Sequence, residues 1–118
     1  MEKLDIAVLG DGGWGTTLAI LLSQKGFKVT LWGAFPEYIF ELNKIRINTK
    51  FLPGIKIPKD IEITHRLNDA ISEKKLIIFA IPSQHLRKVL KKIKRLDYHR
   101  KSLFLSVIKG IEIGSLKR

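Results

Sequence analysis

Apolar and polar positions in the first third of the chain repeat in the order strand, helix, strand. An apolar run at Leu4–Leu9 leads into the glycine-rich turn Gly10–Gly15, and a helical segment then continues to Gly26, a residue type common at helix ends. The segment Lys28–Trp32, rich in β-branched and aromatic residues, predicts a second strand. Strand, helix and strand within about 30 residues is the length of one βαβ unit.

The same alternation continues to about residue 108. The pattern predicts helices at Glu37–Ile47, Leu67–Ser72 and Gln84–Arg95, and strands at Ile61–Thr64, Leu76–Ile81 and Ser102–Ile108. The run Leu76–Ile81 is apolar throughout, as expected for a parallel strand that is buried on both faces. Alternating strands and helices favour an α/β fold with a doubly wound parallel sheet, in which residues 1–118 form a single domain.

The segment between residues 48 and 60 interrupts this alternation. It contains two prolines and a glycine, which are typical of loops. It also contains four large apolar residues that need cover from solvent, namely Phe51, Leu52, Ile55 and Ile57. We therefore expect an ordered loop here and not a flexible linker.

The turn Gly10–Gly15 reads G-D-G-G-W-G and lies between a predicted strand and a predicted helix. In this context a G-x-G-x-x-G pattern indicates a dinucleotide site. Gly10 would allow the tight turn, Gly12 would let the backbone approach a pyrophosphate, and Gly15 would let the helix pack close to the strand. The helix that begins here also directs unpaired N–H groups at an anion. The alternative is a glycine-rich turn that binds nothing.

Several further residues are expected beside this turn. In a doubly wound sheet, ligands bind at the carboxyl ends of the strands. This rule places Gly10–Gly15, Ala34, Pro82–Ser83 and Lys109 along one edge of the sheet. Pro82 stops its strand, and Ser83 can cap the helix that follows. We expect a dinucleotide to bind along this edge.

The end of the second predicted strand is where dinucleotide folds distinguish NAD from NADP. An acidic residue there would bind the adenosine ribose, whereas an arginine would suit a 2′-phosphate. The residues at this place are Gly33, Ala34 and Phe35, and Glu37 comes two positions late. The choice between NAD and NADP therefore stays open. Within the glycine turn a carboxylate beside a pyrophosphate would be repulsive, so we expect the Asp11 side chain to point outward.

Composition excludes several classes of function. The chain has no cysteine, which excludes disulfides, thiolate metal sites and cysteine nucleophiles, and its three histidines share no metal-ligand spacing. No segment reaches the ~18–20 apolar residues of a membrane span, and the N-terminus has no signal-peptide pattern. We expect a cytoplasmic protein that holds no metal.

The formal net charge of +11 favours anionic partners, from nucleotides to nucleic acid. Basic residues concentrate between Arg87 and Lys101, on and after the last predicted helix. Electrostatic binding to nucleic-acid phosphates would be one use of them. However, the sheet needs the apolar face of this helix, and no aromatic stacking platform accompanies the charges. We therefore expect no specific nucleic-acid partner.

Five motifs follow one another along the whole chain. They are Ile6–Thr16 with its tryptophan before the last glycine, Val29–Gly33 with Pro36-Glu37, the loop residues Asn43, Arg46, Asn48 and Phe51–Gly54, then Ile81–Gln84, and finally Lys109–Glu112. In this order and at this spacing they resemble the N-terminal, cofactor-binding domain of bacterial NAD(P)-dependent glycerol-3-phosphate dehydrogenases.

The resemblance implies a Rossmann-like fold and reversible hydride transfer between NAD or NADP and dihydroxyacetone phosphate, which gives glycerol 3-phosphate for phospholipid synthesis. It also implies roles for individual residues. Gly13 and Trp14 would place N–H groups at the pyrophosphate, and Phe51 would lie near the cofactor. Pro82 would lie under the nicotinamide side, and Lys109 would reach both cofactor and substrate. Where the family usually has arginine or histidine this chain has Ala34, which leaves a preference for NADP open.

The family also continues into an all-helical second domain that supplies the proton donor and the contacts to the substrate phosphate. Residues 1–118 thus resemble the cofactor domain of a two-domain enzyme without its partner domain. We expect no turnover from this chain alone and assign it no catalytic residue. For the full-length protein, a homodimer is compatible with the resemblance. Two alternatives stay open: a dinucleotide-binding or sensing module without catalysis, and another dehydrogenase with the same cofactor domain, which Phe51–Gly54 and Lys109–Gly110 disfavour.

Overall fold

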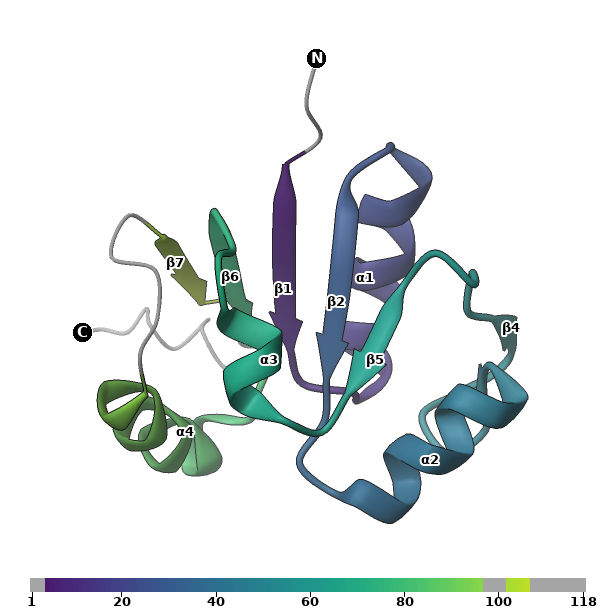
Figure 1. The fold of residues 1–118 in the computed structure, drawn as a ribbon. Helices are drawn as coiled ribbons and strands as arrows, with labels where there is room; N and C mark the ends of the chain where they lie inside the picture. The colour runs from purple at the N-terminus through teal and green to yellow at the C-terminus, as the bar shows by residue number, and fades with distance from the viewer. Residues whose placement is uncertain (1–3, 97–101, 107–118) are drawn as a thin grey trace.

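The computed structural model describes residues 4–96 and 102–106 of the chain. A five-stranded sheet runs through its centre, and every pair of neighbouring strands is parallel. In spatial order the strands are β5 (Glu62–Thr64), β2 (Lys28–Trp32), β1 (Asp5–Leu9), β6 (Leu76–Phe79) and β7 (Leu103–Ser106) (Figure 1). The chain builds outward from β1 to β5 and then returns past β1 to build β6 and β7. This order confirms the doubly wound parallel sheet.

Helices cover both faces of the sheet. They are α1 (Gly13–Gln24), α2 (Pro36–Ile45), α3 (Leu67–Ile71) and α4 (Ser83–Arg95), with α1 behind the sheet and α3 in front of it in Figure 1. Successive residues of β1 point to opposite faces of the sheet and pack in two different hydrophobic clusters. Ile6 and Val8 pack in the cluster that includes α1 and α2, whereas Ala7 and Leu9 pack in the cluster that includes α3 and α4. Burial on both faces explains why the central strands β1 and β6 read as apolar runs after their first residue.

The helix α2 ends at Ile45, two residues before the predicted end. Arg46 adopts a left-handed backbone conformation with φ of 61°, which terminates the helix. Its guanidinium donates hydrogen bonds to the carbonyl oxygens of Pro58 (3.0 Å) and Ile61 (2.7 Å). These bonds tie the end of α2 to the segment that leads into β5.

The start of α4 differs from the expected cap. The helix begins at Ser83 itself, and Pro82 occupies the N-cap position with φ of −53° and ψ of 143°. No side chain caps this helix, so the prediction that Ser83 caps it was wrong. The proline fixes the extended entry into the helix one residue earlier than the sequence pattern indicated.

The segment predicted as an ordered loop contains a two-stranded antiparallel hairpin. Its strands are β3 (Ile47–Asn48) and β4 (Leu52–Lys56), and they form a sheet separate from the central one. The strand pattern was hidden because β3 has two residues, while β4 contains Pro53, which has no N–H, and Gly54, whose φ is +87°.

Cover for the four apolar residues of this segment is uneven. Ile57 is buried and Leu52 is half-buried, as expected. Phe51 and Ile55 are each 46% exposed, so the expectation that they are covered was wrong. The hairpin lies at the periphery of the fold, and four consecutive residues of β4, from Pro53 to Lys56, are exposed to solvent. Phe51 is thereby available at the surface next to the glycine turn.

Candidate dinucleotide-binding site

The carboxyl ends of β1, β2 and β6 meet at one edge of the sheet. Leu9 pairs with Trp32 on one side and with Phe79 on the other. Beyond the strands, the Gly10 N–H donates to the Trp32 carbonyl and the Ala80 N–H donates to the Leu9 carbonyl, both at 2.8 Å. The glycine turn, Ala34 and Pro82 therefore leave the sheet at the same edge. Lys109 lies outside the described residues.

Two glycines of the turn are required by close packing of backbone on backbone. Gly10 has φ of +130°, and a Cβ there would lie 2.2 Å from the Ala80 carbonyl oxygen. A Cβ on Gly15 would lie 2.0 Å from the Gly10 carbonyl oxygen. Both distances are well inside van der Waals contact, so the strand, the turn and α1 fit together only without side chains at these positions. This matches the structural roles expected for Gly10 and Gly15.

Gly12 is different, because nothing in the fold requires a glycine there. It is the N-cap of α1, its φ of −72° suits any residue, and a Cβ would have no heavy atom within 4 Å beyond its chain neighbours. The first N–H groups of a helix have no acceptor within the helix, and no side chain caps this one. The N-terminus of α1 therefore directs donors into open space, as an anion site requires.

A buried asparagine from the hairpin holds the turn in place. Asn48 is fully buried, and its Nδ2 donates to the Asp11 carbonyl oxygen (2.7 Å) and to Thr16 Oγ1 (2.8 Å). Its Oδ1 accepts hydrogen bonds from the Tyr38 hydroxyl and the Phe51 N–H. In a planar trans peptide the carbonyl and the next N–H point in opposite directions. Holding the Asp11 carbonyl inward therefore turns the following N–H outward.

Phe51 reaches the turn through its backbone. A Cβ on Gly13 would lie 2.7 Å from the Phe51 carbonyl oxygen, so the hairpin packs directly on the first residue of α1. The Phe51 ring makes an edge contact with Tyr38, with 6.2 Å between ring centroids. The structure thus brings Gly13 and Phe51 together, as their expected proximity to one ligand requires. Trp14, the second residue of α1, is 60% exposed.

A cavity of about 570 Å³ opens between the turn, the start of α2 and the hairpin. It is lined by Asp11, Phe35, Glu37, Tyr38, Glu41, Lys50 and Phe51. Ala34 and Pro82 are exposed at the same edge of the sheet. Trp32, in contrast, is buried and donates from Nε1 to the His65 carbonyl oxygen at 3.0 Å. Trp32 therefore belongs to the core.

The expectation that Asp11 points outward was wrong. Its Oδ2 lies 2.3 Å from the position that a Cβ on Gly33 would occupy, so the carboxylate rests on the carboxyl end of β2. This place is open because residue 33 has no side chain. Burial raises the pKa of Asp11 above its ordinary value, while its own backbone N–H and the charge of Lys50 act in the opposite direction. An acid between two glycines, beside a glycine at the end of β2, was the signal available in the sequence.

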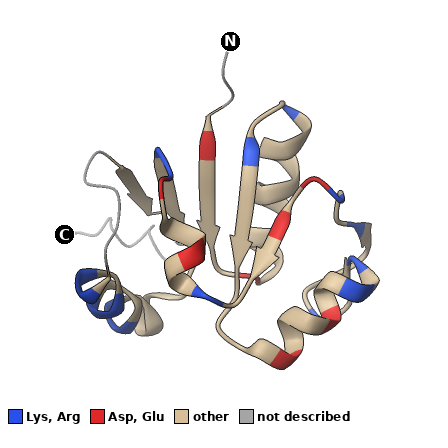
Figure 2. Cartoon of the chain, viewed as in Figure 1, with Lys and Arg blue, Asp and Glu red and all other residues tan. Residues whose placement is uncertain are grey.

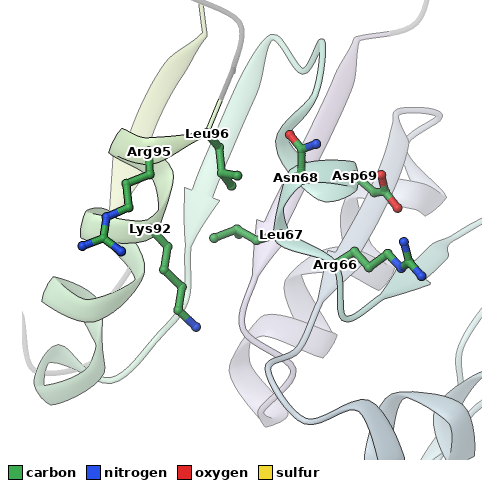
Figure 3. Close-up of a pocket in the computed structure, with 7 residues that line it drawn as sticks. All are labelled: Arg66, Leu67, Asn68, Asp69, Lys92, Arg95 and Leu96. Carbon is green, nitrogen blue, oxygen red and sulfur yellow. The ribbon is translucent and has the colours of Figure 1, made fainter.

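A second cavity, of about 430 Å³, lies between α3 and α4 (Figure 3). Three of its lining residues, Arg66, Lys92 and Arg95, are basic. Their charged ends point away from one another and do not converge on a common point (Figure 3). We therefore do not assign an anion site there.

Residues 4–96 and 102–106 contain no group of three histidine, aspartate or glutamate side chains placed to hold a metal ion. None of the helices in the same ranges is long and apolar enough to cross a membrane.

Comparison with known proteins identifies the family. A family model described as the N-terminus of NAD-dependent glycerol-3-phosphate dehydrogenase matches residues 5–118. The chain belongs to this family. The resemblance seen in the five sequence motifs is confirmed, and so is NAD or NADP as the cofactor of the family.

Individual relatives agree with the family model. The chain is 43% identical over 113 residues to glycerol-3-phosphate dehydrogenase (NAD(P)+) of Prosthecochloris aestuarii, covering 96% of this chain and 34% of the relative. It is 44% identical over 115 residues to the enzyme of the same name from Pelodictyon phaeoclathratiforme, covering 98% and 34%. The crystal structure of glycerol-3-phosphate dehydrogenase from Coxiella burnetii superposes with a TM-score of 0.85 at 30% identity, covering 92% of this chain and 33% of that one. The chain thus spans about a third of the length of these relatives.

Proposed function

We propose that this chain is the cofactor-binding half of an oxidoreductase that interconverts dihydroxyacetone phosphate and glycerol 3-phosphate with NAD(H) or NADP(H). The observation that carries the proposal is the start of α1, where no side chain caps the helix and the outer side of Gly12 is empty. This geometry suits a pyrophosphate, and it occurs in a chain that matches the family over residues 5–118.

The proposed contacts follow from the placement of residues at the carboxyl edge. Gly12, Gly13 and Trp14 would donate N–H groups to the pyrophosphate, while Gly10 and Gly15 would hold the turn. Ala34 would lie near the adenosine ribose, and Phe51 would lie beside the cofactor. Pro82, the N-cap of α4 beyond the end of the neighbouring strand β6, would lie on the nicotinamide side. For Lys109, contacts to both cofactor and substrate rest on the resemblance.

The reaction sets requirements that the described residues meet in part. When bound, the nicotinamide cofactor supplies or accepts the hydride. The substrate carbon that exchanges this hydride must be held in position against the nicotinamide ring. The carbonyl oxygen must also receive a proton from an acid. Within residues 4–96 and 102–106 the carboxyl edge would supply the proposed cofactor contacts, and we assign no proton donor to it. We therefore propose that the described part of the chain contributes cofactor binding to the reaction.

Titration of the chain with NADH tests the binding step, with cofactor fluorescence as the readout. Gly12→Asp places a carboxylate at the pyrophosphate position and should weaken NADH binding at least about 100-fold, because two like charges would meet at contact distance and the side chain would occupy the space of the phosphate. Circular dichroism and the melting temperature should stay close to wild type, since position 12 is open. Asp60→Asn, an exposed change before β5 and hence at the opposite edge of the sheet, is the control. Equal NADH affinity of Gly12→Asp and wild type would contradict the pyrophosphate assignment.

The cellular part of the proposal rests on the resemblance. Glycerol 3-phosphate made by the complete enzyme would feed glycerophospholipid synthesis in the cytoplasm, with the enzyme acting as a homodimer. The alternative is a module that binds or senses a dinucleotide without catalysis. Adding dihydroxyacetone phosphate and NADH to the complete gene product separates the two, because only the enzyme oxidises NADH in proportion to the substrate consumed.

A further inference from the structure

The cavity beside the glycine turn lies where a dinucleotide fold contacts the adenosine ribose, at the carboxyl end of β2. The residues that follow β2, Gly33 and Ala34, carry no charge. The charge at this place comes from Asp11, which reaches across from the glycine turn. We propose that Asp11 makes the site select NAD(H) over NADP(H). The inference rests on the proposed function, since it requires a dinucleotide at this turn.

The position of Asp11 supports this role. Its Oδ2 and Cγ lie 2.3 and 2.6 Å from the place that a Cβ on Gly33 would occupy, so the carboxylate fills the space of the missing side chain. An acid at the end of β2 normally binds the ribose hydroxyls of NAD. Here a carboxylate reaches the same place from the neighbouring strand. Its oxygens accept hydrogen bonds from hydroxyl groups, but they repel the 2′-phosphate of NADP.

The other charges around the cavity act in the same direction. Glu37 and Glu41 of α2 also line it, whereas Lys50 is the one cation among its described lining residues. The Lys50 ammonium lies 5.2 Å from the centroid of the Phe51 ring. Three carboxylates therefore face one ammonium group. An added 2′-phosphate would enter a region of net negative charge, without the arginine that NADP sites commonly provide.

The excess positive charge of the whole chain does not change this preference. Basic side chains gather on α4, whereas α2 carries acidic residues along the part beside the cavity and a lysine in its last turn (Figure 2). α2 packs on β5 at one end of the sheet, whereas Val89 and Ile93 of α4 belong to the other core cluster, which includes residues of β6. Attraction from α4 favours NADPH, which carries the additional charge of its 2′-phosphate, but this attraction is long-range and screened by salt, so it contributes little to the difference between the two cofactors. Discrimination between the two cofactors must come from groups close to the ribose.

The test compares the dissociation constants of NADH and NADPH for the 118-residue chain and three variants. The wild-type chain should bind NADH at least about tenfold more tightly than NADPH. Asp11→Asn keeps the size of the side chain and removes its charge, so the ratio of the two constants should fall about tenfold, mainly through tighter NADPH binding. Ala34→Arg adds a cation at an exposed position of the same edge and should strengthen NADPH binding selectively. Asp60→Asn, the same chemical change at the opposite edge, should leave the ratio unchanged.

The outcomes separate this inference from the proposed function. If NADH binds and Asp11→Asn leaves the ratio of the two constants at its wild-type value, the role of Asp11 is refuted while the dinucleotide site stands. Tighter binding of NADPH than of NADH by the wild-type chain would also overturn the inference. If neither cofactor binds the wild-type chain, the proposed function fails, and the inference fails with it. A wild-type ratio that declines as salt is raised, with a smaller decline in Asp11→Asn, would support an electrostatic origin.

Discussion

Replacing Asn48 with alanine should destabilise the fold and weaken dinucleotide binding together. The Asn48 side chain makes four hydrogen bonds, to the Asp11 carbonyl, the Thr16 hydroxyl, the Tyr38 hydroxyl and the Phe51 N–H. These partners belong to the glycine turn, α1, α2 and the hairpin. One fully buried side chain thus connects all the segments that surround the start of α1.

The loss in free energy of unfolding for Asn48→Ala follows from these contacts. A hydrogen bond contributes about 0.5–1.5 kcal/mol net, so four bonds set a range of roughly 2–6 kcal/mol. Some partners keep a second bond in the variant. The Asp11 carbonyl still accepts from the Thr16 hydroxyl, and the Tyr38 hydroxyl still accepts from the Lys50 N–H. We therefore expect Asn48→Ala to lower the free energy of unfolding by about 2–4 kcal/mol, a large part of the stability of a domain of this size.

The effect on binding follows from the orientation of the turn. Without the hydrogen bond from Asn48, the Asp11 carbonyl keeps only the longer bond from the Thr16 hydroxyl (3.3 Å), so the N–H of Gly12 is held outward less firmly. A hydrogen bond to a charged group contributes about 1.5–3 kcal/mol, so NADH should bind about 10- to 100-fold more weakly to the folded variant.

Urea unfolding followed by tryptophan fluorescence measures the stability, and NADH titration below the unfolding transition measures the binding. The control is Asn68→Ala, an asparagine-to-alanine change at an exposed position of α3, which should alter the stability by less than about 0.5 kcal/mol. The reasoning would be refuted if Asn48→Ala differed from wild type no more than the control does. Loss of stability with unchanged affinity of the folded protein would refute the positioning role alone.

Three further changes test other parts of the structure. Gly15→Val should cost more than about 3 kcal/mol, because its Cβ would meet the Gly10 carbonyl oxygen at 2.0 Å, and a melting temperature near wild type would contradict this packing. Asp11→Asn should raise the melting temperature at neutral pH, because a pKa raised by folding means that the ionised Asp11 carboxylate destabilises the fold. The difference in melting temperature between the variant and wild type should disappear as the pH falls through the folded-state pKa toward the ordinary value of 3.8. Arg46→Ala removes the hydrogen bonds to two carbonyls and should lower the free energy of unfolding by about 1–3 kcal/mol. Arg46→Gly removes the same bonds but relaxes the positive φ, so its loss should be up to about 1 kcal/mol smaller. Equal urea midpoints of the two variants would show that the left-handed backbone carries no strain.

The sequence alone predicted the parts of this fold that depend on local patterns. The strand, glycine turn and helix at residues 5–24 could be read directly, because glycine spacing and apolar runs are properties of neighbouring residues. The hairpin was missed, since a two-residue strand paired with one that contains Pro53 and Gly54 has no alternating pattern. Short strands of this kind are stabilised by their surroundings.

The parts of the site that escaped prediction depend on contacts between distant segments. Asn48 was recognisable only as part of a loop motif, because its partners Asp11 and Thr16 are more than 30 residues away. The orientation of Asp11 depends likewise on the empty space over Gly33. The Asn48 contacts and the orientation of Asp11 therefore form only when folding brings these distant segments together.

The close backbone packing around Gly10 and Gly15 has a consequence for the thermodynamics of binding. With the carbonyl of Ala80 against one glycine and the carbonyl of Gly10 against the other, the turn has little room for alternative conformations. The N–H donors at the start of α1 are thus preorganised before a ligand arrives, and ordering them costs little entropy. Backbone NMR order parameters in residues 10–15 should accordingly be high without ligand and rise only slightly when NADH binds. Whatever ordering accompanies binding should be found in the exposed side chains around the cavity, such as Phe35 and Phe51.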